Sequence, residues 1–81
     1  MLFSIYLYKA VVLYDFEGQH GTSELTIVAG ETLTVISKDV GEGWWEGNNQ
    51  RGESGIFPAA YVEVIAYVMN SDKIQSIAFS S

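Results

Sequence analysis

The fold of this chain is decided by one stretch, Trp44-Trp45-Glu46-Gly47-Asn48-Asn49-Gln50-Arg51-Gly52-Glu53-Ser54-Gly55-Ile56-Phe57-Pro58. Its middle, residues 48–52, is rich in Asn and Gly, which favour a tight turn. The flanks are short and carry aromatic and branched residues, which is typical of strands. Pro58 has no N–H to give to a sheet, so it ends the second flank. The stretch therefore predicts a β-hairpin with strands at 44–47 and 54–57.

Three more strands are predicted on either side of this hairpin. Residues 10–14 form a short apolar run rich in β-branched side chains, and residues 32–37 alternate apolar and polar side chains. Residues 62–65 form the last strand, after a segment at 59–61 that is long enough for one 3₁₀ turn. Five short strands with two wide loops and one tight hairpin predict an all-β fold, a small five-stranded barrel with one short 3₁₀ turn.

The inward faces of these strands supply the candidate core. We expect it to contain Val12, Leu25, Ile27, Leu33, Val35, Phe57 and Val62. Gly47 interrupts a strand, and such a glycine often marks a site where another backbone segment approaches closely.

The aromatic residues outnumber what this core needs. The chain has eleven Phe, Trp and Tyr residues, and the core above uses one of them. Neighbouring strand residues point to opposite faces, so Trp44 and Trp45 cannot both serve one core. We place Trp44 at a ligand and Trp45 over the outer sheet face. Tyr14, Pro58 and Tyr61 also lie at strand ends or loops, and gathered with Trp44 they would form an exposed apolar patch with polar tips, a common mark of a binding site.

Composition excludes several classes of function. The chain has 81 residues, 48% of them hydrophobic and 17% charged, which indicates one small packed domain. Ten acids against four bases give a net charge of −6, so we expect no nucleic-acid binding and an attraction for basic partners. No apolar stretch approaches the roughly 20 residues that span a bilayer. One histidine and no cysteine leave no disulfide, no thiolate nucleophile and no transition-metal site, and no cofactor is expected.

Catalysis is not expected either. His20, Ser23 and Glu24 are close in sequence, but crowding on one loop does not supply the geometry of a catalytic triad. The segment 52–56 approaches a nucleophile elbow, yet Ile56 takes the place of its last glycine and no helix follows. We therefore predict that the chain is not an enzyme.

Four segments in order resemble the Src homology 3 (SH3) domain family. Residues 12–16 (Val-Leu-Tyr-Asp-Phe) resemble its "ALYDY" signature, and residues 24–31 resemble its diverging turn. Residues 43–47 (Gly-Trp-Trp-Glu-Gly) resemble its tryptophan strand, and residues 55–62 (Gly-Ile-Phe-Pro-Ala-Ala-Tyr-Val) its last motif. Within the family the chain is most similar to the SH3 domains of the endocytic sorting nexins, the nexin 9, 18 and 33 group.

The resemblance divides the chain into three parts. It implies an SH3 domain at residues 9–65, an apolar N-terminal flank at 1–8 and a C-terminal tail at 66–81. The flank lacks a basic segment before it and a small-residue cleavage site after it, so we do not expect it to be a targeting signal.

The resemblance also implies a function: an adaptor that binds proline-rich Pro-x-x-Pro peptides in the polyproline II conformation, with a basic Arg or Lys flank. By motif position the peptide-binding residues are Tyr14, Phe16, Glu17, Glu24, Glu42, Trp44, Pro58 and Tyr61, and Asp39 lies on the same loop as Glu42. Phe16 replaces a tyrosine of the family, Ile56 stands where many members have an aromatic residue, and Ala60 replaces a frequent asparagine.

The partners implied by the resemblance are proline-rich proteins, among them dynamin-type GTPases and actin regulators of the WASP family. We expect a cytoplasmic monomer that works in endocytic trafficking or actin-linked signalling, is recruited to membranes through its parent protein and does not itself bind the membrane. The alternative is a structural or self-associating β-barrel that uses its apolar ends, residues 2–8 and 64–69, in place of a peptide groove. These ends could also pair with each other as extra strand length.

Overall fold

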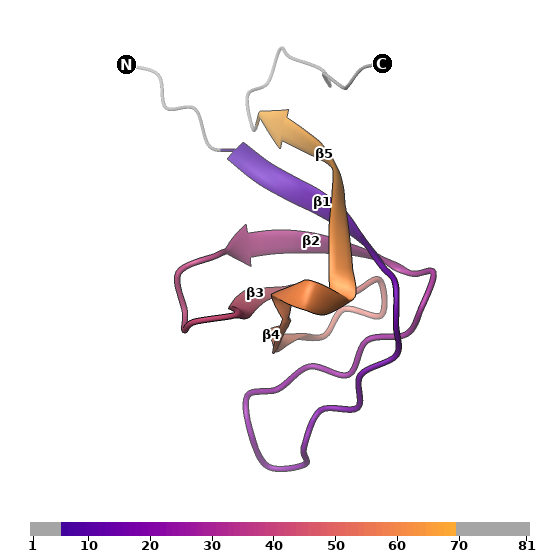
Figure 1. Cartoon of the computed structure of the whole chain (residues 1–81), viewed down its shortest axis with the longest axis vertical. Helices are drawn as coiled ribbons and strands as arrows, with labels where there is room; N and C mark the ends of the chain where they lie inside the picture. The colour runs from indigo at the N-terminus through magenta and orange to yellow at the C-terminus, as the bar shows by residue number, and fades with distance from the viewer. Residues whose placement is uncertain (1–5, 70–81) are drawn as a thin grey trace.

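The computed structural model describes residues 6–69 (Figure 1). Five antiparallel strands form one sheet in the order β4-β3-β2-β1-β5. The elements are β1 (Tyr6–Val12), β2 (Thr32–Ser37), β3 (Trp44–Asn48), β4 (Ser54–Pro58), the 3₁₀ helix η1 (Ala59–Tyr61) and β5 (Val62–Met69). The predicted all-β fold with five strands and one 3₁₀ turn is confirmed. Within residues 6–69 there is no helix long and apolar enough to cross a membrane.

The hairpin of β3 and β4 forms as its sequence predicts. Trp44 lies opposite Pro58, Trp45 opposite Phe57 and Gly47 opposite Gly55. Asn49, which is 6% exposed, closes the turn with its side-chain oxygen, which accepts hydrogen bonds from the backbone N–H groups of Arg51 (2.9 Å) and Glu53 (3.0 Å). These backbone N–H groups lie in or beside the turn, where the amide side chain of Asn49 acts as their acceptor. This explains why the turn contains asparagine.

The core contains all seven predicted residues and one more, Ala10, which is fully buried. Gly47 also lies where we expected a close approach. A Cβ atom at this position would collide with the carbonyl oxygen of Thr34 on β2, so β2 and β3 can pair here only because position 47 has no side chain.

The two ends of the described chain pair with each other. β1 begins at Tyr6, opposite Met69 of β5, so the pairing extends beyond the strands predicted at 10–14 and 62–65. This is the alternative in which the two apolar ends pair with each other as extra strand length, and it is confirmed for residues 6–8 and 67–69. β5 gains one residue at a β-bulge, because Lys9 pairs with Ala66 while Ala10 pairs with Val64. The remaining parts of the predicted flank and tail, 1–5 and 70–81, lie outside the described residues.

The first strand ends earlier than predicted because the chain leaves the sheet after Val12. The N–H of Leu13 donates to the carbonyl of Tyr61 (2.7 Å), and the chain then enters the long loop 13–31. This loop folds back on itself through two hydrogen bonds between Phe16 and Ile27, each 2.9 Å. Figure 1 shows it projecting from the end of the molecule opposite the paired ends of β1 and β5.

Candidate peptide-binding surface

Four aromatic rings form a continuous row, which we call the aromatic row: Tyr14, Tyr61, Phe16 and Trp44. The ring centroids of Tyr14 and Tyr61 are 5.8 Å apart, those of Tyr61 and Phe16 are 6.0 Å apart, and those of Phe16 and Trp44 are 5.9 Å apart. Each pair meets edge to face, at interplanar angles of 72–84°. Such contacts contribute about 0.5–1.5 kcal/mol each beyond the area they bury, so the rings fix one another in place.

The row is assembled from three separate parts of the chain. Tyr14 and Phe16 come from the loop after β1, Trp44 is the first residue of β3, and Tyr61 is the last residue of η1. Pro58 faces Trp44 across the hairpin, and directly opposed residues project to the same side of a sheet. Ile56 shares this side, because it lies two residues before Pro58 on β4. The structure thus brings together all five apolar residues of the predicted site.

The aromatic row has an inner and an outer side. Phe16 and Tyr61 are half-buried and pack against the core, whereas Tyr14 is 60% exposed. Trp44 is half-buried as well. A set of rings supported from below and open above is a preformed apolar surface rather than a part of the core.

Trp45 does not lie where we predicted. It was expected over the outer sheet face, but it lies opposite the fully buried Phe57 and packs, half-buried, against the core. Its indole also makes a cation–π contact with Lys38, whose ammonium lies 4.5 Å from the ring centroid of Trp45 and 3.7 Å from that of Tyr8. Trp44 and Trp45 still point to opposite sides, as neighbouring strand residues must.

The predicted acids fall into two groups. Glu17 and Glu24 both line a cavity of about 330 Å³ along the long loop, together with Glu53. The carboxylate of Glu24 accepts a hydrogen bond from the N–H of Gln19 (2.9 Å), so one of its oxygens serves the loop itself. Glu42 lies exposed on the other loop, which leads into Trp44, and so does Asp39.

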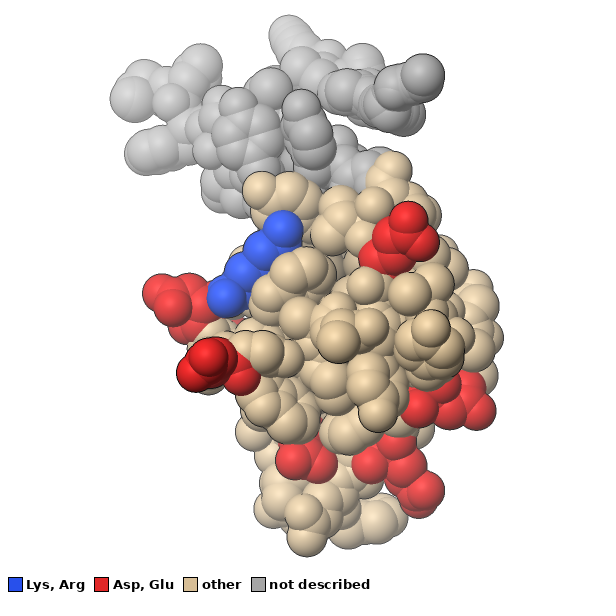
Figure 2. Space-filling view, in the orientation of Figure 1, with Lys and Arg blue, Asp and Glu red and all other residues tan. Residues whose placement is uncertain are grey.

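Glu17 lies between the aromatic row and the cavity along the long loop. It follows Phe16 of the aromatic row, and besides the cavity it lines a second hollow of about 270 Å³ together with Asp15 and Phe16. Figure 2 shows acidic side chains around the edge of one face and uncharged residues over its centre.

The basic groups of the described chain are all engaged elsewhere. The ammonium of Lys9 donates to the hydroxyl of Thr34 (2.7 Å), that of Lys38 lies over two rings, and Arg51 pairs with acids outside the predicted site. Within residues 6–69, no ion pair therefore neutralises Glu17, Glu24 or Glu42. Their charge is therefore uncompensated within these residues, which makes the electrostatic potential beside the aromatic row negative.

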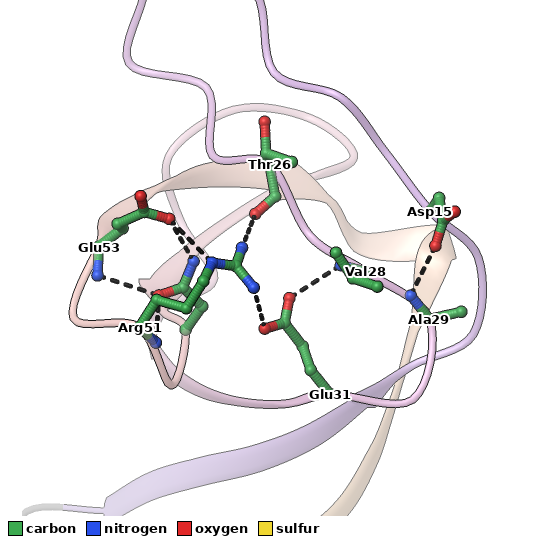
Figure 3. A network of polar contacts seen from close by, with 8 residues as sticks. Asp15, Thr26, Val28, Ala29, Glu31, Arg51 and Glu53 are labelled. Atoms are coloured by element: carbon green, nitrogen blue, oxygen red, sulfur yellow. Dashed lines mark hydrogen bonds and ion pairs between the residues drawn. The ribbon is translucent and has the colours of Figure 1, made fainter.

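Sequence reasoning missed a polar network around Arg51, drawn in Figure 3. Its guanidinium contacts Glu31 at 2.8 Å and Glu53 at 3.3 Å. The side-chain hydrogen bond from Asn49 holds the pKa of the Glu53 carboxyl below its ordinary value; Arg51 acts in the same direction, and desolvation opposes both. The only local signal was the short spacing of Asn49, Arg51 and Glu53, because Glu31 is 20 residues away from Arg51.

A five-stranded barrel with a supported aromatic row beside acidic loops has the architecture of a protein-interaction module. The family model of the SH3 domain matches residues 11–59, and the chain belongs to the SH3 domain family. Members of this family are non-enzymatic interaction modules, which confirms the predicted absence of catalysis.

Sorting nexins are among the proteins that this chain resembles. It is 55% identical over 49 residues to sorting nexin lst-4 of Caenorhabditis elegans, covering 60% of this chain and 9% of that protein. It is 42% identical over 57 residues to sorting nexin-33 of Homo sapiens, covering 70% of this chain and 10% of that protein. The chain thus spans about a tenth of the length of these relatives.

A solved structure supports the fold directly. The C-terminal SH3 domain of myosin IB from Entamoeba histolytica, bound to an EhFP10(GEF) peptide, is 34% identical with a TM-score of 0.62, over 73% of this chain and 93% of that one. The predicted resemblance to SH3 domains, and to those of sorting nexins in particular, is confirmed.

Proposed function

We propose that this domain binds proline-rich peptides in the polyproline II conformation along the aromatic row. The observation that carries the proposal is the unbroken chain of ring contacts from Tyr14 through Tyr61 and Phe16 to Trp44, open on its outer side. A polyproline II helix has three residues per turn and no internal hydrogen bonds. Its ridges fit the spaces between rings, and because the helix is already stiff, little conformational entropy is lost on binding.

The polar tips of the aromatic row complete this contact. The hydroxyls of Tyr14 and Tyr61 and the indole N–H of Trp44 are donors for peptide carbonyls that have no partner within the helix. Pro58 and Ile56 supply flat apolar contacts beside Trp44. Since Ile56 replaces the aromatic residue of many family members, this edge of the surface offers no ring to stack on.

We further propose that an Arg or Lys beside the proline core of the peptide binds at the acidic loops. Glu17 is adjacent to Phe16, and Glu42 lies two residues before Trp44. One oxygen of Glu24 holds the loop, which leaves its other oxygen for the ligand. The indole face of Trp44 adds a cation–π contact for the same basic group. Affinity in the micromolar range, about −8 kcal/mol, is expected for so small a surface.

The biological setting is proposed from the relatives. Sorting nexins are among the relatives reported above, so we propose that the domain acts as a monomer in an endocytic or actin-linked protein of the cytoplasm. Membrane recruitment would come from other parts of the parent protein. Dynamin-type GTPases and WASP-family regulators are the proposed proline-rich partners.

The test is a residue-resolved NMR titration with two peptides that share a Pro-x-x-Pro core and differ only in an Arg or a Gln at the flank. We expect shifts at the aromatic row with both peptides, and additional shifts at Glu17, Glu24 and Glu42 with the Arg peptide alone. Shifts confined to other surfaces would refute the proposal. Concentration-dependent shifts along β5 without any peptide would instead favour self-association.

A further inference from the structure

Arg51 reaches out of its own hairpin and binds the long loop (Figure 3). From the turn between β3 and β4, its Nη2 donates to the backbone carbonyl of Thr26 (3.0 Å), 25 residues away. Its Nη1 donates to Glu31 (2.8 Å), and the other oxygen of that carboxylate accepts the N–H of Val28 (2.8 Å). Arg51 thereby fixes two points of the returning half of the loop, residues 26–31.

Thr26 passes this constraint to the outgoing half of the loop. Its hydroxyl accepts a hydrogen bond from the N–H of Gly18 (2.9 Å), while its carbonyl is held by Arg51. The two halves are in tight contact there, because a Cβ atom on Gly18 would lie 2.7 Å from the carbonyl oxygen of Glu24. Gly18 directly follows Glu17, so the bond at Thr26 sets the path of the backbone next to the aromatic row.

Ile27, the residue after Thr26, fixes the position of Phe16. Ile27 exchanges both of its backbone hydrogen bonds with Phe16, at 2.9 Å each. Phe16 is the middle of the aromatic row, since its ring touches both Tyr61 and Trp44. A shift of residues 26–27 would therefore move the one ring that joins the two halves of the row.

We propose that Arg51 and Thr26 are positioning residues for peptide recognition, which act by holding the long loop in its binding conformation. The inference rests on the function proposed above and adds to it two residues that lie outside the predicted site. A loop that is already ordered loses less conformational entropy when a ligand binds. The hydrogen bonds that order the loop therefore raise its affinity for the peptide. Arg51 also draws Glu31 and Glu53 into its own network and leaves Glu17 and Glu24 to the ligand.

The decisive variant is Thr26→Val, which removes the hydroxyl and keeps the branched shape and the carbonyl. Its matched control is Thr34→Val, which also removes a hydroxyl acceptor, that of the Lys9 bond on β2. Arg51→Met removes the guanidinium, and Arg51→Lys keeps the charge without the fork that serves three acceptors. Affinity for the Arg-flanked and Gln-flanked peptides is measured at a temperature where melting curves show every variant folded.

We expect Thr26→Val and Arg51→Met to weaken binding of both peptides about threefold to tenfold, with Arg51→Lys in between and Thr34→Val unchanged. Amide exchange at Gly18 should accelerate in Thr26→Val and Arg51→Met, less so in Arg51→Lys, and not in Thr34→Val. A purely structural role would lower the melting temperature and leave the affinity of folded molecules unchanged, and that result would overturn the inference. If the wild-type domain bound neither peptide, the proposed function and this inference would both fail.

Discussion

The two adjacent tryptophans allow a test in which one residue type is removed from two opposite faces. Trp44 belongs to the aromatic row, and Trp45 packs on the core and carries Lys38. Trp44→Ala should weaken peptide binding by about 2 kcal/mol, roughly thirtyfold, as expected for a central aromatic contact. Trp45→Ala should leave the affinity of folded molecules within about twofold of wild type.

The stability effects should run in the opposite order. Trp44→Ala loses one edge-to-face contact with Phe16, about 0.5–1.5 kcal/mol. Trp45→Ala removes a half-buried indole from the core, for which we take about 2 kcal/mol as less than the full-burial cost. It also removes the contact with Lys38, about 0.5–1 kcal/mol. At about 4–8 °C per kcal/mol for a domain of this size, the melting temperature should fall by about 2–12 °C for Trp44→Ala and by about 10–24 °C for Trp45→Ala.

Each variant keeps a single indole, so tryptophan fluorescence during a peptide titration reports on one face at a time. Emission of Trp44 should change on peptide addition in Trp45→Ala, and emission of Trp45 should stay constant in Trp44→Ala. Melting is followed by circular dichroism, and the titrations are run in the cold so that both variants stay folded. The reasoning is wrong if Trp44→Ala binds within threefold of wild type, or if it destabilises the domain more than Trp45→Ala does.

Three further changes probe the supports of the surface. Gly47→Ala forces a methyl group against the carbonyl of Thr34 and should cost about 1–3 kcal/mol, measured by urea unfolding; an unchanged midpoint would contradict the close approach of β2 and β3. Glu53 has a lowered pKa, so its ionised form stabilises the fold above the ordinary value of 4.5, and this contribution disappears as the pH falls through the lowered pKa. Glu53→Gln should therefore flatten the loss of melting temperature in acid, and a wild-type slope in the variant would refute the contact with Asn49. Lys38→Met should lower stability by at most about 1 kcal/mol at neutral pH, whereas a larger loss would mean that Lys38 does more than cover two rings.

Local patterns explain which parts of the fold could be predicted. The alternation of residues 32–37 and the turn chemistry of 48–52 act over a few residues, so the strands around them were correctly placed. The extension of β5 to Met69 could be raised only as one alternative for the apolar ends, because an apolar run without a period becomes a strand only through its partner, the start of β1.

The candidate site divides in the same way. Three rings of the aromatic row, those of Tyr14, Trp44 and Tyr61, could be predicted because a small barrel has no room for them inside, whereas Phe16 was implied only by the resemblance to SH3 domains. The residues that hold the aromatic row in place do so through hydrogen bonds between positions 8 to 25 apart, such as those of Thr26 with Gly18 and with Arg51. Sequence periodicity does not predict hydrogen bonds of this kind. Trp45 was misplaced because alternation says that two neighbours face opposite sides and does not say which side is inward.

The pairing of Tyr6 with Met69 has a consequence for how the domain would sit within a longer polypeptide. Strand partners lie only about 5 Å apart, so the backbone enters and leaves the barrel through one narrow neck. The long loop with Tyr14 and Phe16 projects from the other end (Figure 1). A host protein could therefore hold the barrel by two neighbouring linkers at one end. The long loop at the other end would then face outward, and neither linker would need to cross it.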